Sequence, residues 1–382
     1  MRSIMVSVGE ASGDLHGAAL AAALWQLEPD LRIFGVGGQA MRSAGVEIVY
    51  DIAELGVVGL VEVLRNLPRL FKVKALLTTL MERERPDVLV VIDYPGFNTR
   101  LAKEAKAKGI PVVYYIAPKV WAWGRGRAKT IAAAADKVAA IFPFEVPLYR
   151  EAGADVDFVG HPLLDLACPQ LSRQEAFAYF GADPERPVVL LMPGSRRQEI
   201  TGLLPVFLAA AEKIQKARPE CQFFLPLAST ISPEMVQNRI SRCAVSVTLT
   251  RDRTYDLMSI SRVAVAASGT ATLETALLGV PTVIAYKMSA VTALIARRLI
   301  RVPWVGLPNI VAGRSILPEL LQEDANPAMI AAAALQLLQE GPERNAALAA
   351  MARLREDLGG SGVLERVART VLATAGGRAL RK

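Results

Sequence analysis

An aspartate at the end of a predicted strand, Asp93, is well placed in this 382-residue sequence to accept a proton. The run DVLVVID over 87–93 reads as a buried strand, and Tyr94 and the turn pair Pro95-Gly96 follow it. In open α/β sheets, ligands bind outside the carboxyl ends of the strands, so a carboxylate there can act as a general base. A side chain that only caps the DYPGFN turn is the alternative, and the sequence alone does not decide between them.

The first predicted strand leads into a second candidate binding loop, SVGEASGDLHG. Gly9 and Gly13 permit close backbone approach, and Ser12 or Asp14 can cap the helix that begins there. With Glu10 in the same loop, the helix start would offer N–H groups and a positive dipole end to a sugar or phosphate. An ordinary capped turn between a strand and a helix explains the same letters.

The loop MPGSRRQEI, in the second half of the chain, carries groups suited to a diphosphate. Gly194 and Ser195 supply backbone N–H groups, and the guanidinium of Arg196 can pair with phosphate oxygens without Mg²⁺. We favour Arg196 over Arg197 because it lies nearer the Gly194-Ser195 turn. Two solvated arginines are the alternative.

A related loop, SGTATLE, follows another predicted strand. Ser268, Gly269 and Thr270 place small side chains and N–H donors at a helix start. Glu274 lies four residues after Thr270 on the same helix face, within reach of a ribose diol. A capping box formed by threonine and glutamate is the alternative.

The stretch GVGGQA, residues 35–40, matches the dinucleotide fingerprint G-x-G-x-x-A only weakly. It follows the second predicted strand, and the downstream acid is ambiguous between Asp51 and Glu54. A dehydrogenase therefore stays a minor alternative. The absence of a G-x-x-x-x-G-K-[ST] loop from the sequence disfavours a P-loop NTPase.

Two basic and apolar segments, 57–74 and 293–304, have the pattern of helices on an anionic lipid surface. Pro68 is expected to break or kink the first of them. Amphipathic helices packed on their own core are the alternative. In the first segment, the expected apolar face comprises Leu60, Leu64, Leu67 and Phe71. The opposite, basic face comprises Arg65, Arg69 and Lys72.

Composition narrows the function classes. Hydrophobic residues make up 52% and charged residues 21%, which indicates well-buried domains, and the net charge of +7 favours an anionic partner. The three cysteines lack C-x-x-C spacing and are expected to be buried inert thiols, and only two histidines are present, so neither a metal site nor a cofactor is predicted. No apolar run reaches about 18 residues, and the N-terminus reads as the first strand of a cytoplasmic protein.

Short apolar runs alternate with helical stretches, which predicts parallel α/β structure in two similar halves. The join lies near 162–187, and the helices after Gly359-Gly360 either return to the first half or reach a neighbouring chain. The predicted strands are 4–8, 31–36, 87–93, 111–116, 137–143 and 155–160, then 188–194, 221–227, 245–250, 262–269 and 281–286, with a helix over 202–217.

Nine stretches in this order resemble the lipid-A-disaccharide synthase family over nearly the whole chain. They are GEASGDLHG, GVGG, VVIDYPGFN, APKVWAWGRGR, FPFE, FVGHP, MPGSRRQEI, SGTATLE and GLPNIVAGR. The resemblance implies a GT-B fold of two Rossmann-like domains with a cleft between them. It places an acceptor- and membrane-binding domain at 1–165, a UDP-sugar domain at 166–355 and a terminal helix at 356–382, on the first domain or on the partner in a homodimer.

The resemblance implies inverting transfer of 2,3-diacylglucosamine from its UDP derivative to 2,3-diacylglucosamine 1-phosphate (lipid X), giving a β-1,6-linked disaccharide and UDP. Asp93 would be the base on the acceptor 6-hydroxyl. The enzyme would work at the inner face of the inner membrane, without nucleic acid. UDP would be held by Gly194, Ser195, Arg196, Ser268, Gly269, Thr270, Glu274 and Asn309, while the acceptor side would include Gly9, Glu10, Ser12, Gly13, Asp14, Trp121, Trp123, Arg125, Arg127 and Arg314.

Two other functions fit part of the pattern. A UDP-sugar 2-epimerase shares the two-domain fold, but it would act on a soluble sugar nucleotide and would have no use for an apolar surface over 57–74. A membrane-surface module that binds nucleotide without catalysis would tolerate loss of the Asp93 carboxylate. Lipid binding and an Asp93 substitution therefore separate the three hypotheses.

Overall fold

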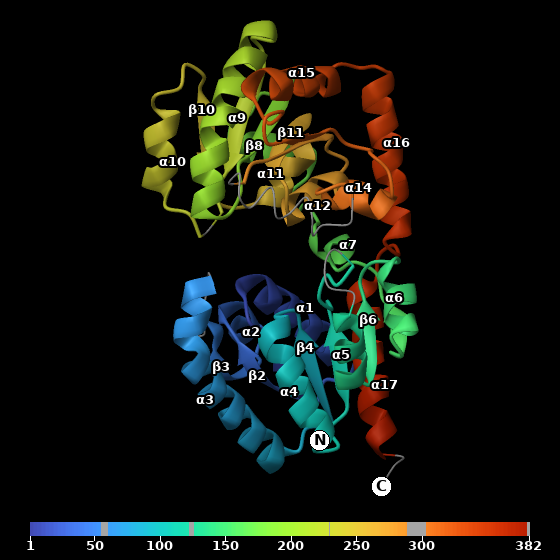
Figure 1. The fold of residues 1–382 in the computed structure, drawn as a ribbon. Coiled ribbons are helices and arrows are strands. Elements are labelled where there is room, and N and C mark those ends of the chain that lie inside the picture. Colours follow the sequence, from blue (N-terminus) through green and yellow to red (C-terminus); the bar gives the residue numbers. More distant parts are fainter. Residues whose placement is uncertain (55–59, 122–125, 229, 289–302, 380–382) are drawn as a thin grey trace. The chain divides into compact units, whose positions relative to one another are not determined.

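The computed structural model describes residues 1–54, 60–121, 126–228, 230–288 and 303–379. The chain divides into two compact units, the first made of residues 1–165 and 358–382 and the second of residues 166–357 (Figure 1). Each unit is built around one parallel sheet. The predicted α/β class with two Rossmann-like sheets is confirmed.

In the first unit the described strands form a seven-stranded sheet in the order β3-β2-β1-β4-β5-β6-β7. Each neighbouring pair is parallel. The residues of β4 are all buried, which explains its unbroken apolar run, because a parallel strand covered on both faces has no polar side. The strands are β1 (Ser3–Ser7), β2 (Arg32–Gly37), β3 (Glu47–Asp51), β4 (Val88–Ile92), β5 (Val112–Tyr115), β6 (Lys137–Ala140) and β7 (Val156–Phe158).

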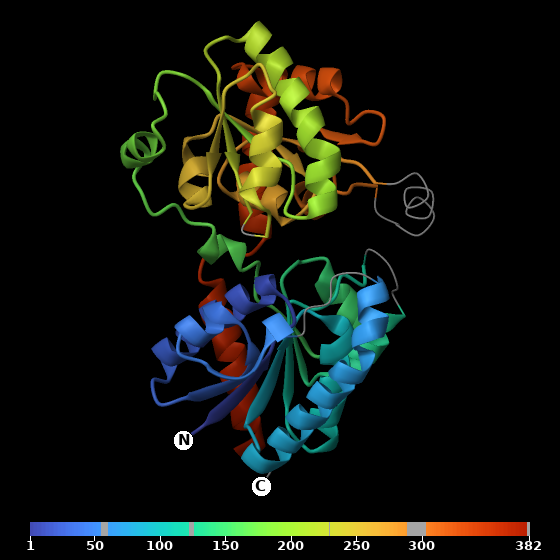
Figure 2. The same cartoon turned by 90° about the vertical axis from the view of Figure 1, so that its left-hand side faces the viewer.

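Helices cover both faces of this sheet (Figure 2). On one face, α3, α4 and α5 contribute to a core with alternate strand residues such as Leu89, Val91 and Tyr114. On the other, α1 packs against α17, β2 and β4. The helices are α1 (Ala11–Leu27), α2 (Gln39–Ser43), α3 (Leu60–Glu84), α4 (Pro95–Ala107), α5 (Arg127–Ala134), α6 (Glu145–Glu151) and α7 (Leu163–Leu166), with a 3-10 turn η1 (Ile52–Glu54).

The C-terminal helix α17 (Val363–Ala379) belongs to the first unit, where it packs on α1, β4, β5 and β6 (Figure 1). Val363, Val367 and Val371 are fully buried and recur every four residues, so one helix face is apolar. The Asp165 carboxylate accepts bonds from the backbone N–H groups of Gly362 (2.7 Å) and Leu364 (2.9 Å). This side chain therefore caps a helix almost two hundred residues further along the chain.

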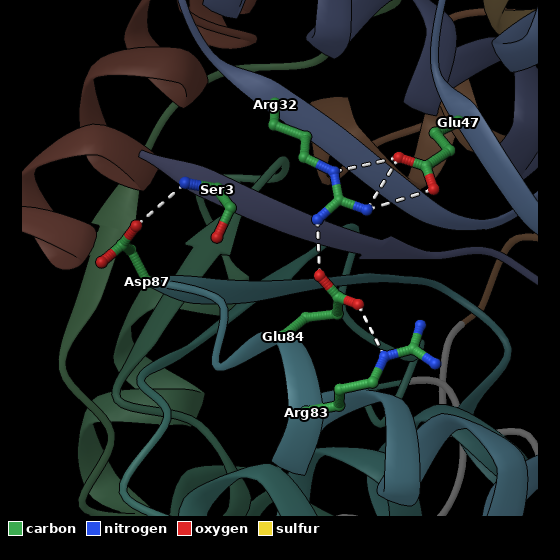
Figure 3. Close-up of polar contacts among 6 residues, drawn as sticks. All are labelled: Ser3, Arg32, Glu47, Arg83, Glu84 and Asp87. Carbon is green, nitrogen blue, oxygen red and sulfur yellow. Dashed lines mark hydrogen bonds and ion pairs between the residues drawn. The ribbon is translucent and has the colours of Figure 1, made fainter. Parts of the chain in front are cut away.

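Charged side chains form hydrogen bonds and ion pairs at the N-terminal ends of the strands of this sheet (Figure 3). Arg32 at the start of β2 donates to the Glu47 carboxylate through Nε (3.0 Å) and Nη2 (3.1 Å), and to Glu84 through Nη1 (2.6 Å). The Ser3 backbone N–H donates to Asp87 (2.9 Å). These groups stabilise the strand starts and lie at the opposite ends of the strands from Asp93.

In the second unit the described strands form a six-stranded parallel sheet in the order β10-β9-β8-β11-β12-β13. Val263 to Ala267 in the central β11 are all buried. The strands are β8 (Val188–Met192), β9 (Gln222–Pro226), β10 (Val247–Thr250), β11 (Val263–Ala267), β12 (Thr282–Tyr286) and β13 (Glu319–Leu321).

Helix α9 packs on β11 and on α15, while α8 and α11 share a core cluster with residues of β8, β9 and β11. The second unit thus follows the same strand-helix alternation as the first. Its helices are α8 (Arg173–Phe180), α9 (Arg197–Ala217), α10 (Pro233–Ile240), α11 (Thr254–Ile260), α12 (Thr270–Leu277), α14 (Leu307–Ala312), α15 (Pro327–Leu338) and α16 (Pro342–Asp357).

Candidate functional site

Asp93 follows β4 directly and lies in a strained turn. Its φ is +48° and that of Tyr94 is +49°, so two consecutive residues with side chains adopt the left-handed conformation. That conformation costs roughly 1–2 kcal/mol for each such residue. An observed strain of this kind points to a position fixed for function.

Asn98 on α4 holds this turn in place and was missed in the sequence. The side chain is fully buried, and its Nδ2 donates to the carbonyl oxygens of Asp93 (2.9 Å), Ile92 (3.0 Å) and Ser7 (3.2 Å). Its Oδ1 accepts a 2.7 Å bond from the Ser7 hydroxyl. Asn98 therefore links the ends of β1 and β4 and fixes the backbone that carries the Asp93 carboxylate.

The electrostatic setting of Asp93 suits a general base. Burial raises the pKa of its carboxyl, while the backbone N–H of Tyr94 and the positive charge of Lys119 oppose that rise. A raised pKa makes the carboxylate a stronger proton acceptor than a solvated aspartate.

The loop after β1 lies against this turn. A Cβ built on Gly9 would lie 2.1 Å from Cγ of Tyr94, so only glycine fits beside the ring. Burial and the negative charge of Glu10 raise the pKa of the Tyr94 hydroxyl. Glu10 and Ser12 are exposed, whereas Gly13 packs against Val8.

The predicted cap of α1 was wrong. The N-cap residue is Glu10, and no side chain bonds to the helix start. Asp14 instead accepts bonds from the backbone N–H groups of Gly38 (2.6 Å), Ala40 (2.8 Å) and Met41 (3.2 Å), which lie at the start of α2. Its buried carboxylate therefore links α1 to the start of α2.

The same contacts argue against dinucleotide binding at GVGGQA. The helix start that follows GVGG, where a phosphate would bind, is occupied by the Asp14 carboxylate. Gly35 has φ +147°, and a Cβ there would lie 2.0 Å from the Val6 carbonyl oxygen, so this glycine serves strand packing. The geometry excludes a dinucleotide pyrophosphate at this loop.

A second buried carboxylate, Glu145 at the start of α6, lies at the same edge of the sheet and was also missed. It accepts bonds from Trp121 Nε1 and from the backbone N–H groups of Ile141 and Phe142, each 3.2 Å long. Burial raises its pKa to about 7, although these three bonds and the charge of Lys119 lower it. The Trp121 ring also lies edge-on to Phe144, with centroids 5.1 Å apart.

This arrangement gives Trp121 a structural anchor. Trp123 and Arg125 lie outside the described residues, and Arg127 is exposed at the start of α5. His161 is buried and His16 is half-buried, and burial lowers their pKa values to about 3 and about 4, so both are neutral at pH 7. The described residues contain no cluster of three or more potential metal ligands.

In the predicted diphosphate loop of the second unit, backbone N–H groups that were expected to bind phosphate are bonded to a carboxylate. Glu199, at the third position of α9, accepts bonds from the backbone N–H groups of Ser195 (2.9 Å) and Arg196 (3.1 Å). A Cβ on Gly194, whose φ is +118°, would lie 2.3 Å from Glu199 Oε2. The Arg196 guanidinium also contacts Glu199 at 3.2 Å but is 73% exposed, which leaves it accessible to a ligand.

The SGTATLE loop is more open. Gly269 and Thr270 are exposed at the start of α12, and a Cβ on Gly269 would meet no atom within 4 Å. Glu274 forms no capping box, since α12 has no side-chain cap, and instead accepts a 3.0 Å bond from the Tyr255 hydroxyl. Burial raises the Glu274 pKa. The Ser268 hydroxyl donates to the Val305 carbonyl (2.8 Å).

Asn309 does not fit its predicted role as a direct ligand of UDP. Its side chain is fully buried and donates to the Leu317 carbonyl and to Glu319 Oε1, each at 2.8 Å. Its Oδ1 accepts from the backbone N–H groups of Ile316 (2.8 Å) and Leu317 (2.9 Å). These four bonds use the whole amide, so Asn309 orders the loop between α14 and β13, near the start of which Arg314 is exposed.

Three further expectations concern Pro68, the two faces of α3 and the cysteines. Pro68 does not end α3, which continues from Leu60 to Glu84. Phe71 and Lys72 are both exposed and so do not lie on opposite faces, while the side chains of 60–67 and most of 293–304 lie outside the described residues. Cys168 is exposed, so the expected burial of all three thiols was wrong. Over the part of the chain that the structure describes, no helix is long and apolar enough to cross a membrane.

Comparisons with solved structures support the fold. UDP-GlcNAc 2-epimerase from Neisseria meningitidis, in a structure with bound UDP-GlcNAc, is similar with a TM-score of 0.67 and 15% identity, covering 98% of this chain and 100% of that one. MurG from Acinetobacter baumannii is similar with a TM-score of 0.60 and 14% identity over the same shares. At these identities only the GT-B fold is shown, so the likeness to an epimerase carries no function.

Sequence comparison goes further. The lipid-A-disaccharide synthase of Geobacter metallireducens (strain ATCC 53774 / DSM 7210 / GS-15) is 47% identical over 375 residues, which cover 98% of each chain. The sequence model described as lipid-A-disaccharide synthetase matches residues 4–370. The chain therefore belongs to the lipid-A-disaccharide synthetase family and is a glycosyltransferase enzyme of lipid A biosynthesis.

Proposed function

We propose that this enzyme transfers 2,3-diacylglucosamine from its UDP derivative to the 6-hydroxyl of 2,3-diacylglucosamine 1-phosphate, with inversion at the anomeric carbon. The products are the β-1,6-linked disaccharide 1-phosphate and UDP. The observation that carries the proposal is the half-buried Asp93, whose backbone Asn98 holds in a strained turn after the central strand β4. Family membership supplies the reaction class.

In the proposed step, the Asp93 carboxylate takes the proton of the acceptor 6-hydroxyl. The acceptor oxygen forms a bond to the anomeric carbon of the donor, and the bond from that carbon to the diphosphate oxygen breaks. UDP leaves with the electron pair of that bond. A single displacement of this kind inverts the configuration and needs one base.

The second unit is the proposed donor site. The exposed Arg196 guanidinium and the open N-terminus of α12 at Gly269 and Thr270 can stabilise negative charge on the leaving diphosphate. Glu274, one turn along α12, can accept hydrogen bonds from the ribose hydroxyls. Asn309 contributes by ordering the neighbouring loop, because its amide has no capacity left for UDP.

We further propose peripheral association with the inner face of the inner membrane. On α3, Phe71 is 56% exposed and Leu76 is 47% exposed, and the exposed Lys72 lies between them in the sequence. An apolar surface flanked by positive charge suits an anionic lipid interface. Membrane association would bring the enzyme to its acylated substrates.

The test is a reconstituted assay without added Mg²⁺. Purified wild-type enzyme and Asp93→Asn are incubated with UDP-2,3-diacylglucosamine and lipid X in detergent, and disaccharide and UDP are measured. Loss of a general base should lower the rate about 10²–10⁴-fold. If the wild type makes no disaccharide, the proposed substrates are wrong. If Asp93→Asn keeps the wild-type rate, Asp93 is not the base.

A further inference from the structure

A basic surface pocket of about 370 Å³ lies in the first unit between α4 and α5. From α4 it is lined by Gly96, Arg100 and Lys103, whose spacing of four and three residues places them on one helix face. From α5 it is lined by Arg127 and Thr130. The two helices thus turn three cations toward one hollow.

Among the described residues that line this pocket, none is an aspartate or a glutamate. The nearest acidic residue of α4 in the sequence, Glu104, is bound to Lys74 at 2.6 Å. The lining therefore carries positive charge and, among the described residues, no carboxylate, which gives a positive potential that attracts a phosphate. Arginine and lysine are the side chains that most commonly bind phosphate, and threonine hydroxyls can add hydrogen bonds.

The pocket begins where the Asp93 turn ends. Pro95, two residues after Asp93, and Gly96 both line it. A smaller hollow shares Gly96 and Arg100 with the pocket and is also lined by Leu70 and the exposed Phe71 of α3. A proton acceptor, a cationic pocket and an apolar surface therefore adjoin one another within the first unit.

We infer that the pocket of Arg100, Lys103 and Arg127 binds the 1-phosphate of the acceptor, an inference that rests on the proposed function. In an acylated glucosamine 1-phosphate, the carbon that bears the phosphate and the carbon that bears the 6-hydroxymethyl group flank the same ring oxygen. The phosphate and the reacting hydroxyl therefore lie along one edge of the sugar. Binding of the phosphate beside Pro95-Gly96 directs that edge to Asp93, and an acyl chain can reach Phe71.

The test compares two acceptors, lipid X and 2,3-diacylglucosamine without the phosphate. Lys103→Ala and Arg100→Ala should each raise the KM for lipid X about tenfold, equivalent to about 1.4 kcal/mol. The KM for the acceptor without phosphate and for the UDP-sugar should not change. Lys129→Ala is the matched control, because Lys129 is exposed on α5 but does not line the pocket.

A second variant tests the pocket without removing charge. A Cβ on Gly96 would meet no atom within 4 Å, so Gly96→Leu should fold and project its side chain into the hollow. It should also raise the KM for lipid X. Equal KM values for lipid X in wild type, Lys103→Ala and Gly96→Leu would overturn the inference.

Two arms separate the remaining outcomes. If Lys103→Ala weakens binding to phosphatidylglycerol vesicles and affects both acceptors equally, the pocket binds lipid headgroups and the inference is wrong. If the wild type forms no disaccharide, the proposed function fails. Calorimetry with glucosamine 1-phosphate and with glucosamine then tests whether the pocket binds phosphate. Tenfold weaker binding of the phosphorylated sugar alone to Lys103→Ala supports phosphate recognition, and unchanged binding refutes it.

Discussion

Replacement of Asn98 by alanine should destabilise the first unit by about 3 kcal/mol and displace Asp93. The Nδ2 group has two hydrogens shared among three carbonyl contacts, and Oδ1 accepts one bond from Ser7, so the side chain supplies about three effective hydrogen bonds. Each contributes about 1 kcal/mol net in a buried setting. The Asn98 bonds also hold Asp93 and Tyr94 in the left-handed conformation. Without these bonds, the backbone of the turn should relax to a less strained conformation.

The assay is urea unfolding followed by tryptophan fluorescence, with kcat measured on the same preparations. Three of the four tryptophans, Trp25, Trp121 and Trp123, belong to the first unit, so the signal reports mainly on it. Ser7→Ala is the matched control: it removes one bond and should cost about 1 kcal/mol. An Asn98→Ala enzyme with wild-type kcat and a loss below about 1 kcal/mol would refute the assigned role.

Three other substitutions test the surroundings of the turn. Because the Glu145 pKa is about 7 in the folded protein against 4.5 in the unfolded chain, the folded state holds an extra proton between those values, and stability should fall by up to about 3 kcal/mol as the pH rises from 4.5 to 7. Glu145→Gln should flatten this dependence in denaturation curves recorded across that range, and an unchanged slope would contradict the assignment. Gly9→Ala should lower kcat strongly because its Cβ would overlap the Tyr94 ring, whereas Gly96→Ala should be tolerated, and equal kcat values for the two variants would contradict this reasoning.

The sequence predicts the strands that lie inside the sheets and misses two at their edges. Val88 to Ile92 form an unbroken apolar run because both faces of β4 are covered. The edge strands β3 and β13 contain half-exposed residues such as Tyr50 and Glu319, so neither shows a clear apolar pattern. Exposure at the edge weakens the apolar signal in β3 and β13, whereas the other two edge strands, β7 and β10, are predicted from the sequence.

The candidate site shows a similar limit. The position of Asp93 could be predicted because it follows from a local feature, the end of a buried strand. Asn98 could not, since its partner Ser7 lies 91 residues away in the sequence. Asn309 looks like a ligand in the motif, yet its partners are backbone and carboxylate groups of its own loop and of β13. Whether a polar side chain already has all its hydrogen-bond partners depends on the tertiary structure.

The return of α17 to the first unit has a consequence for the order of folding during synthesis. The second unit is contiguous, so its sheet can form once residues 166–357 have left the ribosome. The first unit begins earlier but cannot cover the β4–β6 face until Val363, Val367 and Val371 arrive. The part of the enzyme that is translated first is therefore completed last, and until then it exposes an apolar sheet face.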